Sequence, residues 1–234
     1  MMKAIQLFLL MVSVSLVANA QDSILVEKSK AWNEALKGQR QILKSNPLPM
    51  LWGPIILTNE YRLIYEIPVA PRQAIMMGVS YLGKGPLFQA IWESNLDSVP
   101  KQYQAKWIQL GKDARMNGIR VQGMYRFYLT KKHLAPRGIY IGPQASYSTV
   151  KITWASHPDF YFKFNNFNVN FFAGAQGILW DVLAVDVFTG IGYKSNTYEA
   201  PDANGKILTG NATGITGHVE NLKLSLGVNF GYAF

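Results

Sequence analysis

Apolar and polar side chains alternate along the end of the chain. From Leu222 to Phe234 the even-numbered positions are Leu, Leu, Leu, Val, Phe, Tyr and Phe, whereas the odd-numbered positions from Asn221 to Ala233 are polar or small. A period of two places successive side chains on opposite faces of a β-strand. The pattern predicts a strand with one apolar face, and it leaves open whether that face meets a protein core or lipid.

The same alternation predicts seven further strands. Six of them are the segments 54–66, 73–82, 117–129, 138–150, 164–177 and 183–193. The first strand is expected within residues 39–51, where Pro47 and Pro49 confine it to a strand end or a bulge. Each strand has one apolar face, as in the fourth, where Ile119 and Val121 alternate with Arg120 and Gln122.

The connections between the predicted strands alternate in length. Short turns are expected near residues 69–72, 130–137 and 178–182, and longer loops at 83–116, 154–163 and 195–219; only the connection near residues 52–54 breaks the order. Tight turns on one rim and long loops on the other are typical of bacterial outer-membrane barrels, whose periplasmic turns are short. With eight strands, both ends of the barrel domain fall on the periplasmic side.

The size of an eight-stranded barrel indicates which face points inward. Its interior is just wide enough for its own side chains, so small and polar residues suit the inside and bulky apolar residues suit a lipid-facing outside. Charges of both signs in such a lumen are expected to form ion pairs. The predicted lumen network consists of Glu60, Arg62, Glu66, Arg120, Arg126, Asp186 and Lys223. A soluble, lipocalin-like periplasmic barrel that binds lipid, with its faces inverted, is the alternative.

The length of the last strand agrees with a membrane-spanning role. Residues 222–234 give 12 steps of about 3.3 Å, and a tilt near 40° leaves roughly 30 Å along the membrane normal, close to the ~25 Å apolar band of such barrels.

The beginning of the sequence predicts export. Lys3, an apolar run over residues 7–17 and the sequence Ala18-Asn19-Ala20 fit a secretory signal peptide, residues 1–20. Residues 21–38 are expected to form a periplasmic leader with one short amphipathic helix, and residues 39–234 form the barrel domain. The chain has no cysteine, which rules out disulfides and a lipid-anchored cysteine at the amino terminus.

The charge of the chain is moderately basic, with 23 Lys and Arg against 14 Asp and Glu. A basic surplus suits nucleic acid or an acidic membrane surface. Export argues against nucleic acid, and the sequence lacks a basic helix or an aromatic RNA-binding signature.

These features together resemble a family. The signal peptide, the alternating strands and the terminal segment GVNFGYAF are similar to small outer-membrane β-barrels of the OmpA and OmpX type. The resemblance covers about residues 39–234 and concerns architecture. It implies an outer-membrane location, and it implies that Phe230, Tyr232 and Phe234 form the signal read by the barrel-assembly machinery. The proline-rich first strand and the long loop at 83–116 depart from the simplest members.

Candidate catalytic chemistry is sparse. Some eight-stranded outer-membrane barrels modify lipid A, so the three histidines, His133, His157 and His218, are considered as bases. His133 is expected in a periplasmic turn, and neither of the others has a serine partner at a fixed spacing on one strand. The segment around Asp202 and Asn204 lacks most ligands of a calcium loop. No catalytic, metal or cofactor-binding residue is therefore assigned, and a lipid A modifying enzyme is kept as the alternative.

The long loop supplies the candidate interaction surface. Phe88 and Trp92, and then Tyr103 and Trp107, have helical spacing, which predicts two short amphipathic segments separated by residues 95–100. They either pack over the barrel mouth or present aromatic anchors to a protein partner. Basic residues of the same region are placed to contact lipopolysaccharide phosphates: Lys84, Lys101, Lys106, Lys112 and Arg115.

The sequence therefore predicts an all-β, eight-stranded antiparallel transmembrane β-barrel with a short N-terminal helix. A packed lumen leaves no open pore, because pores need more strands. The expected role is non-enzymatic, that of a structural or interaction protein and accessory subunit of a larger outer-membrane complex.

Overall fold

The computed structural model describes residues 40–51, 58–85, 88–94, 96–130, 134–201, 206–211 and 221–234. The predicted signal peptide and leader helix, the connection near residues 52–54, and two of the histidines, His133 and His218, lie outside the described residues. In the described ranges, no helix combines the length and the apolar character needed to cross a membrane.

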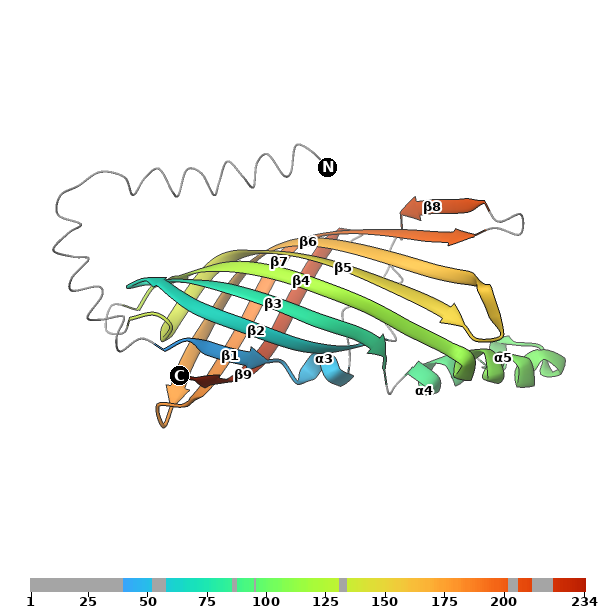
Figure 1. The fold of residues 1–234 in the computed structure, drawn as a ribbon, viewed down its shortest axis with the longest axis horizontal. Coiled ribbons are helices and arrows are strands. Elements are labelled where there is room, and N and C mark those ends of the chain that lie inside the picture. The colour runs from blue at the N-terminus through green and yellow to red at the C-terminus, as the bar shows by residue number, and fades with distance from the viewer. Residues whose placement is uncertain are drawn as a thin grey trace. The chain divides into compact units, whose positions relative to one another are not determined.

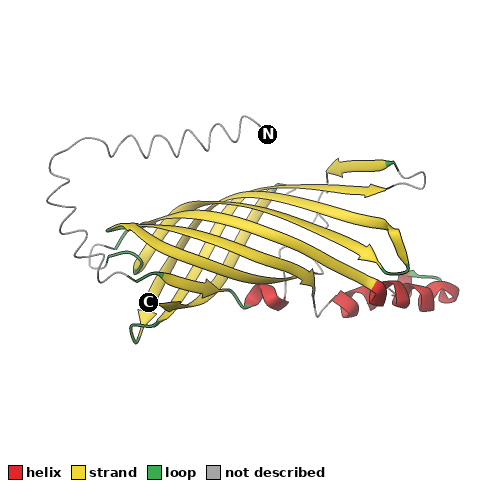
Figure 2. Cartoon of the chain, in the orientation of Figure 1, coloured by secondary structure: helices red, strands yellow, loops and turns green. Residues whose placement is uncertain are grey.

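Nine antiparallel strands form one sheet, and short helices lie in its connections (Figures 1 and 2). The strands are β1 (Ile42–Ser45), β2 (Thr58–Ala70), β3 (Gln73–Lys84), β4 (Ala114–Tyr128), β5 (Gly138–Trp154), β6 (His157–Leu179), β7 (Leu183–Pro201), β8 (Ile207–Asn211) and β9 (Leu222–Ala233). The helical segments are α3 (Leu48–Leu51), α4 (Phe88–Glu93), η1 (Leu96–Ser98) and α5 (Lys101–Asp113).

The sheet closes on itself. The strand order is β6-β5-β4-β3-β2-β1-β9-β7-β8, and an additional pairing of β6 with β7 joins the two sides into a ring. β8 lies outside this ring, because within the described ranges it pairs only with the end of β7, from Thr197 to Pro201. The nine strands therefore differ from the eight predicted by one short strand, which forms a ribbon with β7 in the region of the expected long loop.

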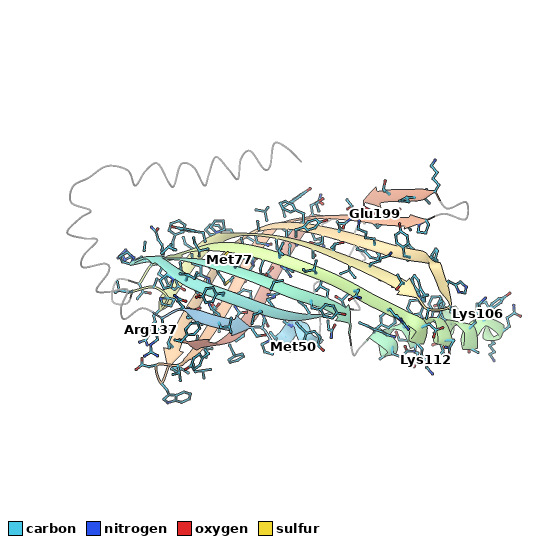
Figure 3. The ribbon with its side chains drawn as sticks, viewed as in Figure 1. Met50, Met77, Lys106, Lys112, Arg137 and Glu199 are labelled. Atoms are coloured by element: carbon cyan, nitrogen blue, oxygen red, sulfur yellow. The ribbon has the colours of Figure 1, made fainter. Side chains whose placement is uncertain are left out.

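The period-two pattern sets the two faces of the ring. Along β4, Val121 is 51% exposed, whereas its neighbours Arg120 and Gln122 are 5% and 7% exposed. On β3, Met77 is 53% exposed and Met76 is 3% exposed; Met77 is labelled in Figure 3. Because successive side chains of a strand point to opposite faces, polar residues fill the interior and large apolar residues cover the outside.

The first strand is shorter than predicted. β1 ends at Ser45, and residues of the expected strand form α3 instead. Asn46 accepts a hydrogen bond from the Leu48 backbone N–H at 3.0 Å, which caps the turn. Proline donates no backbone hydrogen bond and fits the first turn of a helix, so Pro47 and Pro49 turn the chain out of the sheet.

The expected loop at residues 154–163 is wrong. β5 continues to Trp154 and β6 begins at His157, so only two residues connect them. Trp154, Phe160 and Phe162 form an aromatic cluster there, with ring centroids 5.2–6.0 Å apart. Aromatic contacts of this kind, both between strands and along one strand, stabilise the extension of a hairpin. The sequence does not reveal this extension, because the small and polar residues at 155–159 interrupt the apolar alternation.

Candidate functional site

A buried polar network crosses the interior of the ring near the tight turns. Arg126 of β4 donates a hydrogen bond to Asp186 Oδ2 of β7 at 2.8 Å and to Gln176 Oε1 of β6 at 2.9 Å. Its guanidinium also lies 3.3 Å from Glu66 Oε2 of β2. Lys44 of β1 pairs with Glu66, and it lies 3.3 Å from Asp186 Oδ2.

Neutral side chains satisfy the remaining oxygens of the two carboxylates. Tyr128 donates to Glu66 Oε1 at 2.6 Å, and Tyr140 donates to Asp186 Oδ1 at 2.7 Å. Gln176 donates to Glu66 Oε2 at 3.2 Å. Because Glu66 on β2 and Gln176 on β6 are four strands apart in either direction around the ring, this contact spans the interior, and the network closes the lumen at this level.

A second charged cluster lies farther from the tight turns. Arg62 binds both oxygens of Glu60, each at 2.8 Å, and Arg120 reaches Glu60 Oε2 at 3.3 Å and Ser146 Oγ at 3.1 Å. Lys223 of β9 lines the same cavity. Among the described residues, no carboxylate lies within ion-pair distance of Lys223.

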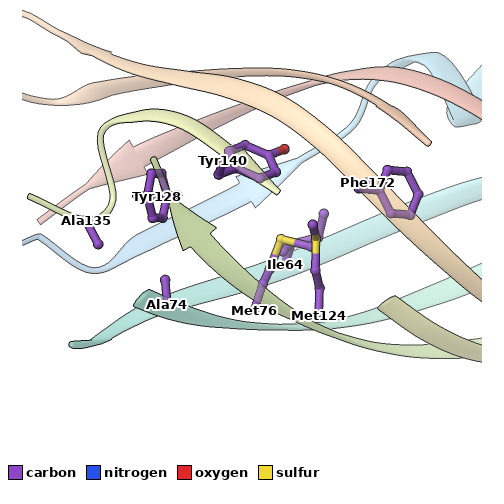
Figure 4. Packing of buried hydrophobic residues seen from close by; sticks show 8 residues of the cluster. All are labelled: Ile64, Ala74, Met76, Met124, Tyr128, Ala135, Tyr140 and Phe172. Carbon is purple, nitrogen blue, oxygen red and sulfur yellow. The ribbon is translucent and has the colours of Figure 1, made fainter. Parts of the chain in front are cut away.

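An apolar layer separates the two polar groups. Ile64 of β2, Met76 of β3, Met124 of β4 and Phe172 of β6 are buried in the interior (Figure 4), and Phe188 packs against them. The layer follows from the sequence of β2, whose inward positions are Glu60, Arg62, Ile64 and Glu66 in turn. A cavity of about 310 Å³ is bounded by this layer and by the second charged cluster.

The structure brings together most of the residues of the predicted lumen network. Six of the seven form ion pairs, in two groups, and Lys223 faces the same interior. Pattern reading missed five members of the first group: Lys44, Tyr128, Tyr140, Gln176 and Asn229, which donates to Asp186 Oδ2 at 2.9 Å. Their signal is parity, because each occupies the polar face of its strand. The four neutral side chains do not stand out as network members, and Lys44 lies on the first strand, whose pattern is interrupted by prolines.

The outer surface of the ring carries a continuous apolar band. Exposed tyrosines mark one margin, with Tyr61 paired to Tyr81 and Tyr193 paired to Leu222 across neighbouring strands. From Ile119 on β4 to Leu129, the residue that follows β4, the ten residue steps of about 3.3 Å, tilted by roughly 40°, rise about 25 Å.

The end of the chain completes the ring. Phe234 and Gln41 exchange two backbone hydrogen bonds of 3.0 Å, next to the pairing of β9 with β1. The three residues of the predicted assembly signal, Phe230, Tyr232 and Phe234, are 46%, 60% and 55% exposed on the outer face. Their recognition by the assembly machinery stays a prediction.

The helices of the long loop occupy the two predicted segments, and they pack against each other. The indoles of Trp92 and Trp107 stack with centroids 4.4 Å apart, and each donates a hydrogen bond to the backbone carbonyl of the other, at 2.9 and 3.2 Å. Phe88 is buried against Ala114. Of the four predicted anchors, Tyr103 alone is an exposed side chain, at 55%. Tyr103 is therefore the anchor that a docking partner could contact.

The arrangement offers no support for catalysis. His157 is exposed at the start of β6, and within the described residues it forms no hydrogen bond with a serine or a carboxylate. The nearby carboxylate of Glu199 on β7 pairs with Lys163 at 3.1 Å. In the same ranges no group of three His, Asp or Glu residues is placed to hold a metal ion.

Comparisons with known proteins give one kind of finding, a solved structure, and no match among families or curated proteins. A solved structure described as a major outer membrane protein from Thermus thermophilus is similar over 83% of this chain and 98% of that chain, with a TM-score of 0.39 and 12% sequence identity.

Proposed function

We propose that the chain is an integral β-barrel of the bacterial outer membrane. β1 to β7 and β9 form an eight-stranded barrel, and β8 extends β7 as a ribbon beyond it. The observation that carries the proposal is the reversed polarity of the ring, with ion pairs inside and a band of large apolar side chains outside.

The alternative of a soluble lipid-binding barrel requires the opposite polarity. Glu66, Asp186 and Arg126 are at most 1% exposed, whereas Ile119 and Val121 are about half exposed. A water-facing wall of this kind is a far larger apolar patch than soluble monomers expose, and lipid removes that cost. A bilayer therefore fits this surface better than water does.

The proposed role is structural or interactive and non-enzymatic. The polar network crosses the lumen from β2 to β6, so the barrel has no open pore. α4 and α5 present Tyr103 and several lysines, of which Lys106 and Lys112 are labelled in Figure 3. This surface suits an accessory subunit of an outer-membrane complex, with the aromatic ring as a protein contact and the lysines as contacts for lipopolysaccharide phosphates.

The proposed orientation follows from the connections. The tight turns between β2 and β3 and between β6 and β7 lie on the same rim as the start of β1 and the end of β9. In outer-membrane barrels that rim is periplasmic. The predicted signal peptide supports export, and the exposed terminal aromatic residues support delivery by the barrel-assembly machinery.

The proposal is tested by spin labels on two adjacent residues. The chain has no native cysteine, so Val121→Cys and the matched variant Gln122→Cys each carry one label. In liposomes, oxygen dissolved in lipid should relax the label at 121 several-fold more strongly than the label at 122. A label at 121 that senses water or a protein interior would show that the polarity is inverted and that the chain is not a membrane barrel.

The interaction role is tested separately in cells. A photo-crosslinking residue at Tyr103 should capture a protein partner, and one at Leu226, on the outer face of β9, serves as the control that contacts lipid. Equal labelling at both positions, or lipid adducts alone, would contradict a role as a subunit.

A further inference from the structure

Among the described residues, the wall of the ring has no second strand beside part of β9. β1 pairs with β9 only between the pairs Ile42–Ala233 and Ser45–Phe230, whereas β7 pairs with β9 from Leu183–Tyr232 to Tyr193–Leu222. Among the described residues, therefore, no strand pairs with residues 222–229 on the side away from β7. This edge, residues 222–229 of β9, is called the β9 edge below.

Side-chain exposure shows the same gap. Leu224 and Leu226 of the β9 edge are 74% and 80% exposed. Two outward-facing residues of the neighbouring strand β7 are less exposed, Ile191 at 53% and Val187 at 48%. All four residues face outward. The extra exposure of the two leucines agrees with this pairing, because no strand of the described residues covers their flank on the side away from β7.

The interior cavity reaches the outer face at this edge. Leu224 and Leu226 point outward, yet they line the cavity together with Pro49 of α3 and with Lys223 and Ser225, which lie on the inner face of β9. A cavity lined by both faces of one strand passes around the edge of that strand. It therefore opens sideways, between β9 and α3, in addition to lying inside the ring.

The cavity carries an excess of positive charge. Four cations line it, Arg62, Arg120, Arg126 and Lys223, and Glu60 is the carboxylate among the described lining residues. The Arg120 Nε atom is buried and has no hydrogen-bond partner among them. Arg62 and Arg120 share the one carboxylate of Glu60, and Lys223 has no ion pair among the described residues, so an anion at this position would be stabilised.

The other half of the cavity is apolar. Ile64, Met76, Phe172 and Phe188 line it directly below the cations. Close packing of side chains stabilises a protein interior. A cavity with an apolar section beside charged groups therefore does not contribute to the stability of the wall. The combination of cations and an apolar section matches an amphiphile with an anionic headgroup.

We propose that this cavity binds an anionic membrane lipid that enters sideways at the β9 edge. Its phosphate is held by Lys223, Arg62 and Arg120, and part of one acyl chain lies against Ile64 and Phe172. The volume of 310 Å³ is at the lower end of the ~300–1,000 Å³ found for small-molecule sites, so the rest of the lipid stays in the bilayer. This inference rests on the proposed membrane location.

The position of the opening favours a membrane lipid over a soluble anion. Leu224 and Leu226 pair with Ile191 and Thr189, which lie inside the apolar band and below the tyrosine margin at Tyr193. In the proposed orientation this is the outer half of the bilayer. A phosphate on a lipid reaches this height, close to the interface, while its chain continues toward the apolar section of the cavity.

The test is native mass spectrometry of the full chain released from detergent after incubation with phosphatidylglycerol or with phosphatidylethanolamine. The chain should retain the anionic lipid about tenfold more strongly. Lys223→Gln should reduce this retention about tenfold, because it removes one charge-assisted hydrogen bond. Lys151→Gln, on the outer wall of β5, is the matched control and should leave retention unchanged.

A second variant tests the route. Ser225→Phe fills the cavity at the β9 edge and should abolish retention, whereas Val121→Phe on the opposite part of the wall should not. Circular dichroism confirms that each variant keeps its β-sheet.

Equal retention of the two lipids, or unchanged retention in both cavity variants, would overturn the inference. Inorganic phosphate that competes fully with the lipid would show a site for a soluble anion and would also overturn it. If the label at residue 121 senses lipid and these results are negative, the inference fails while the proposed function stands.

Discussion

Replacing Arg126 by Gln tests whether the lumen network holds the ring together. Arg126 is 1% exposed and contacts Asp186 at 2.8 Å, Gln176 at 2.9 Å and Glu66 at 3.3 Å. Its guanidinium also lies over the Tyr140 ring, 4.0 Å from the centroid. The substitution leaves two buried carboxylates to share Lys44 as their remaining cation in the network.

The magnitude follows from burial. Removing one partner of a buried ion pair costs about 3–5 kcal/mol, since a charge is left without compensation. Arg137 and Asp181 form a matched surface pair of 2.7 Å, with side chains 38% and 71% exposed. Arg137→Gln should cost far less, because water solvates both charges and screens their attraction. The hydrogen bond from Arg137 lowers the pKa of the Asp181 carboxyl, so this surface pair is intact at neutral pH and weakens only as the pH falls through the lowered pKa.

The assay is urea unfolding of the protein in liposomes, followed by tryptophan fluorescence. Arg126→Gln should lower the free energy of unfolding several-fold more than Arg137→Gln does. Adding Asp186→Asn to Arg126→Gln removes the surplus carboxylate and should recover part of the loss. Equal effects of the two arginine variants, or strictly additive losses in the double variant, would refute the electrostatic explanation.

Two glycine substitutions give further tests. Gly142→Ala places a Cβ 1.8 Å from the Tyr125 backbone carbonyl and should prevent assembly of the folded form, whereas Gly123→Ala meets nothing within 4 Å and should be tolerated; heat-modifiable gel mobility distinguishes them. Gly111→Ala brings a Cβ to 2.4 Å from Trp92 Cδ1 and should separate the stacked indoles, which near-ultraviolet circular dichroism detects.

The period of the sequence predicts the faces of the ring because it is a local property. Arg120 and Arg126 on β4 share a parity, so both point inward whichever strands flank β4. Their partners depend on closure of the ring, which brings Glu60 to Arg120 across β3 and Asp186 to Arg126 across β5 and β6. No local pattern contains that information, which explains why single residues were assigned to the lumen but the two separate groups were not.

Helical spacing likewise predicted α4 and α5 but not their exposure. Trp92 and Trp107 occupy the expected positions, yet they bury their rings against each other. A stripe of aromatic residues is equally suited to a partner and to a neighbouring helix, and the separation of fifteen residues between the two indoles allows the second. Tyr103 lies one turn before Trp107 on the same side of α5, and it remains 55% exposed.

The two prolines after β1 interrupt the alternating pattern of the sequence, and they also end the strand that would otherwise pair with the β9 edge. A barrel that needed only a sealed wall would continue β1 opposite the whole of β9, as β7 does on the other flank. Pro47 and Pro49 instead end β1 after four residues, and α3 follows in place of a longer strand. The backbone groups and leucines left along that edge are tolerated where lipid and a bound amphiphile cover them. The prolines that interrupt the alternation and the cations of the cavity therefore lie at the same place, beside the β9 edge. Departures from local sequence rules are expected at functional sites.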